Sequence, residues 1–175
     1  MPKDSKDEIE QDEKKILSEL VKNAKENMET IAKRCGFSKQ KVWRAIKQME
    51  ENHAIWGYTS IFDEGKIGQK HFMLLLKRTS KQLEEGATDR IVARRAEGLM
   101  TELGGVIESS VYVHGEYDWV VTFAARDIQH AKKYSDSLIA LHPGEIEKIS
   151  ILQTMMFIKK QYILNPDRKK LKDFL

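Results

Sequence analysis

The sequence predicts an α+β fold of two domains, a helical domain followed by one that contains a sheet. Up to Asn52 the apolar residues recur at the helical period. From His71 onward, short apolar and β-branched runs alternate with helical stripes. Between these parts, Gly65 and Gly68 stand in a polar stretch that is typical of a linker. At 175 residues the chain is long enough for two small domains, each with a modest core.

Three helices are predicted before the linker. Asp12 is placed as the N-cap of the first helix, whose apolar stripe runs to about Ala24. Asn27 caps a short second helix, which Gly36 ends. Ser38 then caps a third helix, whose apolar side chains form one stripe and must therefore face the core. These inward residues are Val42, Ile46 and Met49.

The opposite face of the third helix carries cationic and amide side chains, and no acidic residue appears in it until Glu50. Such a helix, preceded by a short helix and a glycine-containing turn, is typical of a recognition helix in the major groove of DNA. A solvated face on an ordinary helical hairpin is the alternative. For Trp43 we expect packing against the first helix rather than contact with DNA. The candidate DNA-binding residues are Ser38, Lys39, Gln40, Lys41, Arg44 and Lys47.

Residues 54–62, AIWGYTSIF, are rich in β-branched and aromatic side chains. We therefore expect a strand or a short wing directly after the third helix. These elements together predict a winged helix-turn-helix domain over residues 1–62 and a linker over residues 63–70.

Residues 71–160 predict the element order βαββαβ. An apolar run begins at His71, and Thr88 caps a helix that ends at two glycines. Two β-rich runs, VIESSVYV and WVVTFAA, flank the segment HGEYD as an antiparallel hairpin. Asp127 caps the next helix, and IEKISILQTMMFI is the final strand. This order gives a four-stranded antiparallel sheet with both helices on one face, which is the ferredoxin-like arrangement.

The second face of this sheet has no predicted cover. Apolar residues must cover it, so we expect a second copy of the chain to stack there and form a homodimer. Residues 161–175 form a charged C-terminal tail, for which we expect an exposed or partner-docked end.

Composition excludes several kinds of protein. The formal net charge is +3 although a third of the residues are charged, which permits a local basic surface but not a polycationic tail binder. The single cysteine, Cys35, rules out an internal disulfide. The five histidines are scattered, so we predict no metal site, and no cofactor is predicted either. With no signal-like or membrane-spanning run, we expect a cytoplasmic protein.

The order and spacing of these motifs resemble the leucine-responsive regulatory protein/AsnC (Lrp/AsnC) family of transcriptional regulators. The resemblance runs from about Asp12 to Lys160 and is carried by IAKRCGFS, the pair Gly57 and Tyr58, and the hairpin motif GEYD. It implies double-stranded DNA as a partner and a dimer, often assembled into tetramers or octamers. His53 departs from the family pattern, because a glycine usually ends the recognition helix there.

The resemblance also implies an effector, commonly an amino acid, held near the GEYD hairpin. The tyrosine of this motif offers a ring and a hydroxyl, and its aspartate can accept hydrogen bonds from an ammonium group. The alternative is a hairpin turn in which the aspartate only caps backbone amides. The candidate effector-binding residues are Gly115, Glu116, Tyr117 and Asp118.

Three other functions are compatible with parts of this pattern. An architectural DNA-binding protein would keep the DNA and lack the effector. Certain decarboxylases of modified tetrapyrroles, which act on sirohaem, share the layout, but the strand VIESSVYV lacks their histidine. An RNA recognition motif needs a basic-Gly-aromatic signature, and WVVTFAA lacks the basic residue and the glycine. We therefore expect a regulator and not an enzyme.

Overall fold

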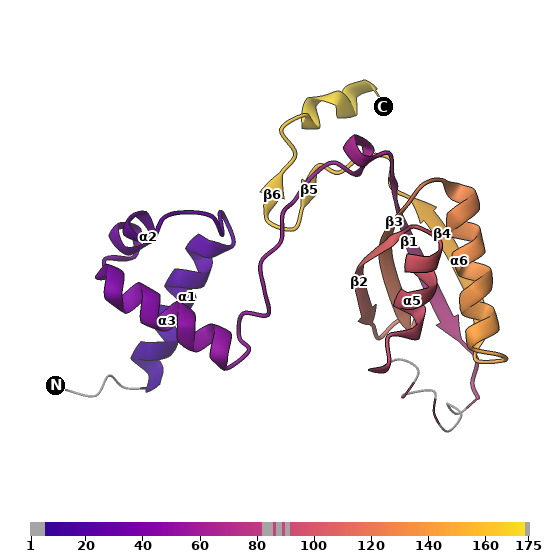
Figure 1. The fold of residues 1–175 in the computed structure, drawn as a ribbon, viewed down its shortest axis with the longest axis horizontal. Coiled ribbons are helices and arrows are strands. Elements are labelled where there is room, and N and C mark those ends of the chain that lie inside the picture. Colours follow the sequence, from indigo (N-terminus) through magenta and orange to yellow (C-terminus); the bar gives the residue numbers. More distant parts are fainter. Residues whose placement is uncertain (1–5, 82–85, 87–88, 90–91, 174–175) are drawn as a thin grey trace. The chain divides into compact units, whose positions relative to one another are not determined.

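The computed structural model describes residues 6–81, 86, 89 and 92–173 (Figure 1). These residues form two compact units. The first unit contains the chain up to Ile61 together with the segment from Ile158 onward, and the second unit is Phe62–Phe157. The last segment of the chain therefore groups with the helical unit, whereas the predicted boundary at residue 160 lies between the sheet domain and a charged tail.

The first unit contains three helices, α1 (Lys6–Leu20), α2 (Met28–Cys35) and α3 (Lys39–Glu51). The prediction that α1 begins after Asp12 is wrong, because the charged residues before it are good helix formers and continue the helix. Acidic residues in its first turn also complement the positive end of the helix dipole. The three helices share one core, which contains Ile16, Leu20, Ile31, Ala32, Val42, Ile46 and Met49.

The caps of α2 and α3 are confirmed. The side chain of Asn27 accepts a hydrogen bond from the amide of Thr30, and Gly36 ends α2 in the left-handed conformation with a φ of 73°. The side chain of Ser38 accepts from the amide of Lys41 at the start of α3. The turn between the two helices is thus fixed at both ends.

The strand predicted for residues 54–62 is absent from the described structure, in which this segment has no ladder partner. A strand forms only when a neighbouring strand supplies hydrogen bonds, so local propensity alone does not produce one. Trp56 in this segment is 96% exposed. The C-terminal segment of the first unit instead contains a small hairpin, β5 (Lys159–Lys160) with β6 (Ile163–Leu164), and a 3₁₀ helix η2 (Arg168–Asp173).

The second unit begins with the 3₁₀ helix η1 (Glu64–Ile67), followed by β1 (Lys70–Arg78), α5 (Arg95–Glu102), β2 (Val106–Tyr112) and β3 (Trp119–Ala125). The helix α6 (Ile128–Leu141) and the strand β4 (Ile146–Gln153) complete it. The strands form one antiparallel sheet in the order β2-β3-β1-β4, which confirms the predicted ferredoxin-like arrangement. Both helices bury residues against the same strand positions, so they cover one face of the sheet.

Two predicted boundaries in this unit differ from the structure. Thr88, the predicted cap of the first helix, lies outside the described residues; α5 begins at Arg95, and Val92, predicted to point inward, is 76% exposed. The final strand ends at Gln153, which pairs with Phe72 of β1, and not at residue 158; beyond it the amide of Thr154 still donates to the backbone oxygen of His71, but the regular ladder stops.

The junction between α5 and β2 requires a glycine at position 105. A Cβ there would lie 2.2 Å from the sulfur of Met100 and 2.8 Å from the backbone oxygen of Ala124. We expect Gly105→Ala to lower the free energy of unfolding by about 1–3 kcal/mol, because a backbone oxygen on the sheet must shift. Thermal unfolding followed by circular dichroism measures this effect. Gly98→Ala is the matched control: nothing lies within 4 Å of the added Cβ, so removing a glycine from α5 should stabilise it.

Candidate nucleic-acid interface

The buried side of α3 determines which of its residues face outward. Val42, Ile46 and Met49 are at most 8% exposed and are held in the core by α1 and α2. Because successive residues of a helix are about 100° apart, the positions opposite this stripe must face outward. Those positions are occupied by Gln40, Arg44 and Lys47, and all three are exposed.

Gln40 and Arg44 present unengaged side chains. Among the described residues, neither makes a side-chain hydrogen bond or an ion pair. A guanidinium group and a carboxamide group are the two side-chain ends that can pair bidentately with guanine and adenine, respectively, in the major groove. The middle of the exposed face therefore carries base-reading chemistry that the fold does not use.

Two lysines beside them are held only by weak surface ion pairs. The Nζ atom of Lys39 lies 3.5 Å from Glu29, and that of Lys47 lies 3.7 Å from Glu51. More than half of each of these four side chains is exposed. Exposed pairs of this kind contribute little to stability, so a phosphate group can replace the carboxylate at small cost.

Two other candidate DNA-binding residues make intramolecular contacts. The Nζ atom of Lys41 lies 2.5 Å from Asp12 and 4.6 Å from the centre of the Phe37 ring, so this lysine links α3 to α1. The hydroxyl of Ser38 is used as the cap of α3, 3.2 Å from the amide of Lys41. The structure thus directs Lys39, Gln40, Arg44 and Lys47 outward and gives Ser38 and Lys41 intramolecular contacts.

Trp43 is a surface residue, whereas the sequence favoured packing against the first helix over contact with DNA. Its side chain is 49% exposed, and the Nζ atom of Lys47 lies over its ring, 5.4 Å from the centroid. The expectation that Trp43 packs into α1 is therefore corrected. The sequence spacing could have indicated this exposure. Trp43 stands four residues after Lys39 and four before Lys47, so the three side chains lie on the same side of the helix.

The acidic end of α3 is tied to the following segment. The hydroxyl of Tyr58 donates to Glu50 at 2.8 Å. Partial burial, together with this hydrogen bond, raises the pKa of Tyr58 to about 12. The contact fixes the carboxylate of Glu50 to Tyr58, away from the guanidinium-bearing middle of the outer face.

The GEYD residues lie at one end of the sheet in the second unit. The amide of Asp118 donates to the backbone oxygen of Leu76, and its Oδ2 atom accepts from the amide of Arg78 at 2.8 Å. One oxygen of Asp118 therefore caps a backbone amide, as expected if the motif were only a hairpin turn. The hydroxyl of Tyr117 lies 3.4 Å from that of Ser150, on β4.

The other two residues of this motif are open to solvent. Glu116 is exposed, and a Cβ added to Gly115 would meet nothing within 4 Å. Gly115 also lacks a positive φ, so a single copy of the chain does not require glycine at this position. A requirement for glycine there has to come from a ligand or a second copy.

The uncovered face of the sheet bears the side chains that alternate with the core residues of each strand. On β1 these include Met73 and Leu75, which are partly exposed and are absent from the buried core. At the rim of this face, His71 is 6% exposed, with its ring nitrogens 2.6 Å from Thr154 and 2.9 Å from Glu108. The face thus carries apolar side chains in its middle, with Thr122 opposite Met73 and Ser150 opposite Leu75, and it is polar at this edge.

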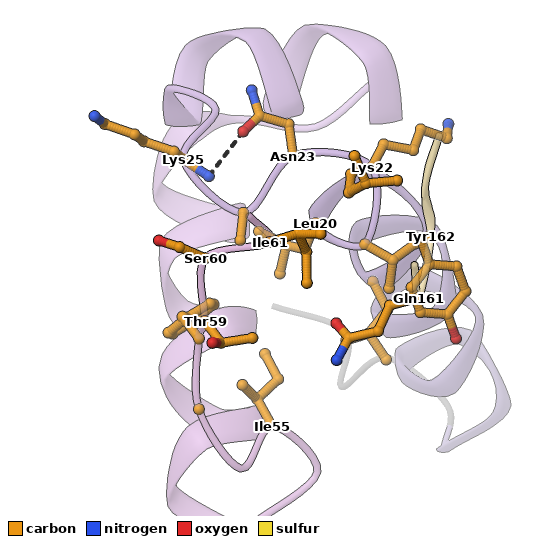
Figure 2. A pocket seen from close by; sticks show the side chains of 16 residues that line it. Leu20, Lys22, Asn23, Lys25, Ile55, Thr59, Ser60, Ile61, Gln161 and Tyr162 are labelled. Carbon is orange, nitrogen blue, oxygen red and sulfur yellow. Dashed lines mark hydrogen bonds between the residues drawn. The ribbon is translucent and has the colours of Figure 1, made fainter. Parts of the chain in front are cut away.

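A cleft of about 740 Å³ lies in the first unit (Figure 2). The end of α1, residues 55–61 and the β5–β6 hairpin contribute its walls. Leu20, Ile55 and Ile61 are among its apolar lining residues, and Asn23 accepts a hydrogen bond from the amide of Lys25 at its edge. Its described lining includes no carboxylate and no histidine, so it offers no acid–base pair. Across the part of the chain that is described, no cluster of potential metal ligands occurs.

Comparison with known proteins identifies the helical part. Residues 13–55 match the winged helix-turn-helix DNA-binding family. An uncharacterized HTH-type transcriptional regulator of Pyrococcus furiosus is 25% identical over 161 residues, which cover 91% of this chain and 99% of the relative. A similar regulator of Pyrococcus abyssi is 23% identical over 88% of this chain and 97% of its own length.

Solved structures share the whole fold. An AsnC family transcriptional regulator from Agrobacterium tumefaciens superposes with a TM-score of 0.62 at 23% identity, over 89% of this chain and 96% of its own. A transcriptional regulator from Neisseria meningitidis, solved as a complex with L-Met, has a TM-score of 0.65 at 16% identity, over 94% of this chain and 97% of its own. The predicted resemblance is confirmed: the chain has a winged helix-turn-helix DNA-binding domain, and its structural neighbours are Lrp/AsnC family regulators. None of the described helices is both long and apolar enough to cross a membrane.

Proposed function

We propose that the chain is a sequence-specific, DNA-binding transcriptional regulator that acts as a homodimer or a higher oligomer and responds to an amino acid or a related small molecule. The observation that carries the proposal is the outer face of α3, where Gln40 and Arg44 are exposed and unengaged among the described residues. Arg44 reads a guanine, Gln40 reads a neighbouring base, and the flanking Lys39 and Lys47 bind phosphates.

A dimer supplies the second half of the DNA site. Helix-turn-helix proteins commonly bind two half-sites related by the two-fold axis of the dimer. The partly exposed apolar residues on the open face of the sheet give a second copy a surface to cover. The sheet unit thus brings the copies together, and the helical unit reads the DNA.

The effector is assigned to the GEYD hairpin. The structure leaves Gly115 and Glu116 open, and one oxygen of Asp118 is not used by Arg78. A carboxylate and a hydroxyl at one hairpin suit the ammonium group of an amino acid, and a structural neighbour was solved as a complex with L-Met. Titration calorimetry with a panel of amino acids should give saturable heat. Absence of heat with every amino acid contradicts this part of the proposal alone.

One observation favours a second candidate, an architectural DNA-binding protein without an effector. Asp118 already caps the amide of Arg78, so the motif has a structural use without any ligand. The two candidates differ in sequence preference. The test is enrichment of duplexes from a random pool by the full-length protein, followed by affinity measurement at one fixed salt concentration. A regulator should bind the enriched duplex at least about 10³-fold more tightly than random DNA, whereas an architectural protein should show little difference.

A further inference from the structure

The one large apolar side chain on the described outer part of α3 is that of Trp43. It is 49% exposed, in a surface whose other members are cationic or amide-bearing as far as Gln48. A partner that covered the exposed half of this ring would gain free energy, because apolar area is removed from water. The position of Trp43 therefore points to a contact that forms on binding.

The stripe that contains Trp43 is continuous with the proposed base-reading residues. Trp43 stands three residues after Gln40 and next to Arg44, so it lies on the N-terminal half of α3. In helix-turn-helix proteins, this half of the recognition helix contacts the base edges. Trp43 thus lies on the flank of the outer face, beside the residues proposed to meet the bases.

The major groove offers an indole ring few groups that suit it. The edges of the base pairs present hydrogen-bond donors and acceptors and one apolar group, the C5-methyl of thymine. A contact with a phosphate would be better served by a donor-rich side chain, and Lys39 and Lys47 already supply those on the same side of α3. The apolar ring complements the methyl group.

Lys47 holds the ring while the protein is free. Its Nζ atom lies 5.4 Å from the centroid of the Trp43 ring and 3.7 Å from Glu51. Both contacts are exposed and therefore weak, and a phosphate competes for the same ammonium group. Transfer of Lys47 to a phosphate would release one face of the indole for the base.

We propose that Trp43 is a specificity-determining residue that recognises a thymine methyl group in each half of the operator. This inference rests on the proposed function, because it requires that α3 lies in the major groove. It assigns to the operator a thymine adjacent to the bases that Gln40 and Arg44 contact.

The experiment removes the methyl group and the ring separately. Duplexes enriched by the wild-type protein are resynthesised with deoxyuridine in place of each thymine in turn, which deletes only the methyl. We expect one symmetric position at which this change weakens binding about fourfold per half-site, the effect of losing one buried methyl group. Trp43→Ala should bind the thymine and uracil duplexes equally, whereas Trp43→Phe should keep part of the difference. Trp56→Ala is the matched control, because Trp56 is 96% exposed outside α3, and it should behave as the wild type.

Three results would overturn the inference. The first is a thymine preference that persists in Trp43→Ala. The second is an enriched duplex in which no thymine methyl affects binding. The third is an equal loss of affinity by Trp43→Ala on enriched and random DNA, which would make the indole a backbone contact. If the wild-type protein enriches no sequence, the proposed function itself fails, and that outcome is recognised before any variant is made.

Discussion

Leu75→Arg is expected to convert the protein from a dimer into a monomer and to abolish measurable binding to the enriched duplex. Leu75 lies on β1, one of the two central strands of the sheet, and faces away from the helices. In a dimer that stacks on this face, the new guanidinium would be buried without a partner, at a cost of several kcal/mol. Size-exclusion chromatography with light scattering gives the mass, and fluorescence anisotropy gives the DNA affinity.

Controls separate loss of the dimer from loss of the fold. The side chain of Leu75 does not belong to the buried core, so the circular dichroism spectrum should stay unchanged. Leu152→Arg on β4 should have the same effect, since Leu152 is 49% exposed. Val92→Arg places the same charge on a 76% exposed residue outside the sheet and should leave the dimer intact. A monomeric mass for the wild-type protein, or an unchanged dimer in both sheet variants, contradicts the stacking of two copies on this face.

The parts of the fold that the sequence predicted are those in which a local pattern determines the outcome. Asn27, Gly36 and Ser38 mark the ends of α2 and α3 because capping depends on residues only a few positions apart. The βαββαβ order follows from changes of hydrophobic period along the second unit. Both predictions needed no knowledge of distant contacts.

The errors occur where the outcome depends on a distant segment. Residues 54–62 have β-propensity, but no neighbouring strand pairs with them in the described chain. The end of β4 depends on its ladder with β1, whose last pair is Phe72 with Gln153, and the sequence of β4 alone does not reveal where this ladder stops. The grouping of the C-terminal hairpin with the helical unit likewise depends on tertiary contacts.

In the candidate site, too, local patterns were predicted correctly and contacts with distant segments were not. The helical period identified Gln40, Arg44 and Lys47 as outward-facing, and the structure agrees. The period did not show that Lys41 is bound by Asp12, a residue on another helix. It also left Trp43 at the border between the inner and outer faces, where the packing of neighbouring helices decides exposure. A contact with another helix therefore engages Lys41, the local N-cap bond engages Ser38, and exposure adds Trp43 to the candidates.

Arg44→Ala is expected to weaken binding to the enriched duplex by about 1–3 kcal/mol per half-site and to relax the preference at one base position. The reason is that an exposed guanidinium with no partner among the described residues is free to pair with the O6 and N7 atoms of guanine. Competition titrations with duplexes substituted at each position measure both effects. Because the Arg44 side chain makes no hydrogen bond or ion pair with the residues that the structure describes, the thermal stability of the variant should change little.

The matched control is Arg34→Ala, which removes the same charge from α2 in the same unit. Arg34 is paired with Glu19 at 3.2 Å and with Glu26 at 3.5 Å, so its guanidinium is already engaged. This variant should keep the base preference of the wild type at every position. A base contact and a phosphate contact also differ in salt dependence, because only the phosphate contact releases counterions. If Arg44→Ala weakens enriched and random duplexes equally and lowers the salt slope by about one, Arg44 is a phosphate anchor, and the base reading has to come from Gln40 and Trp43.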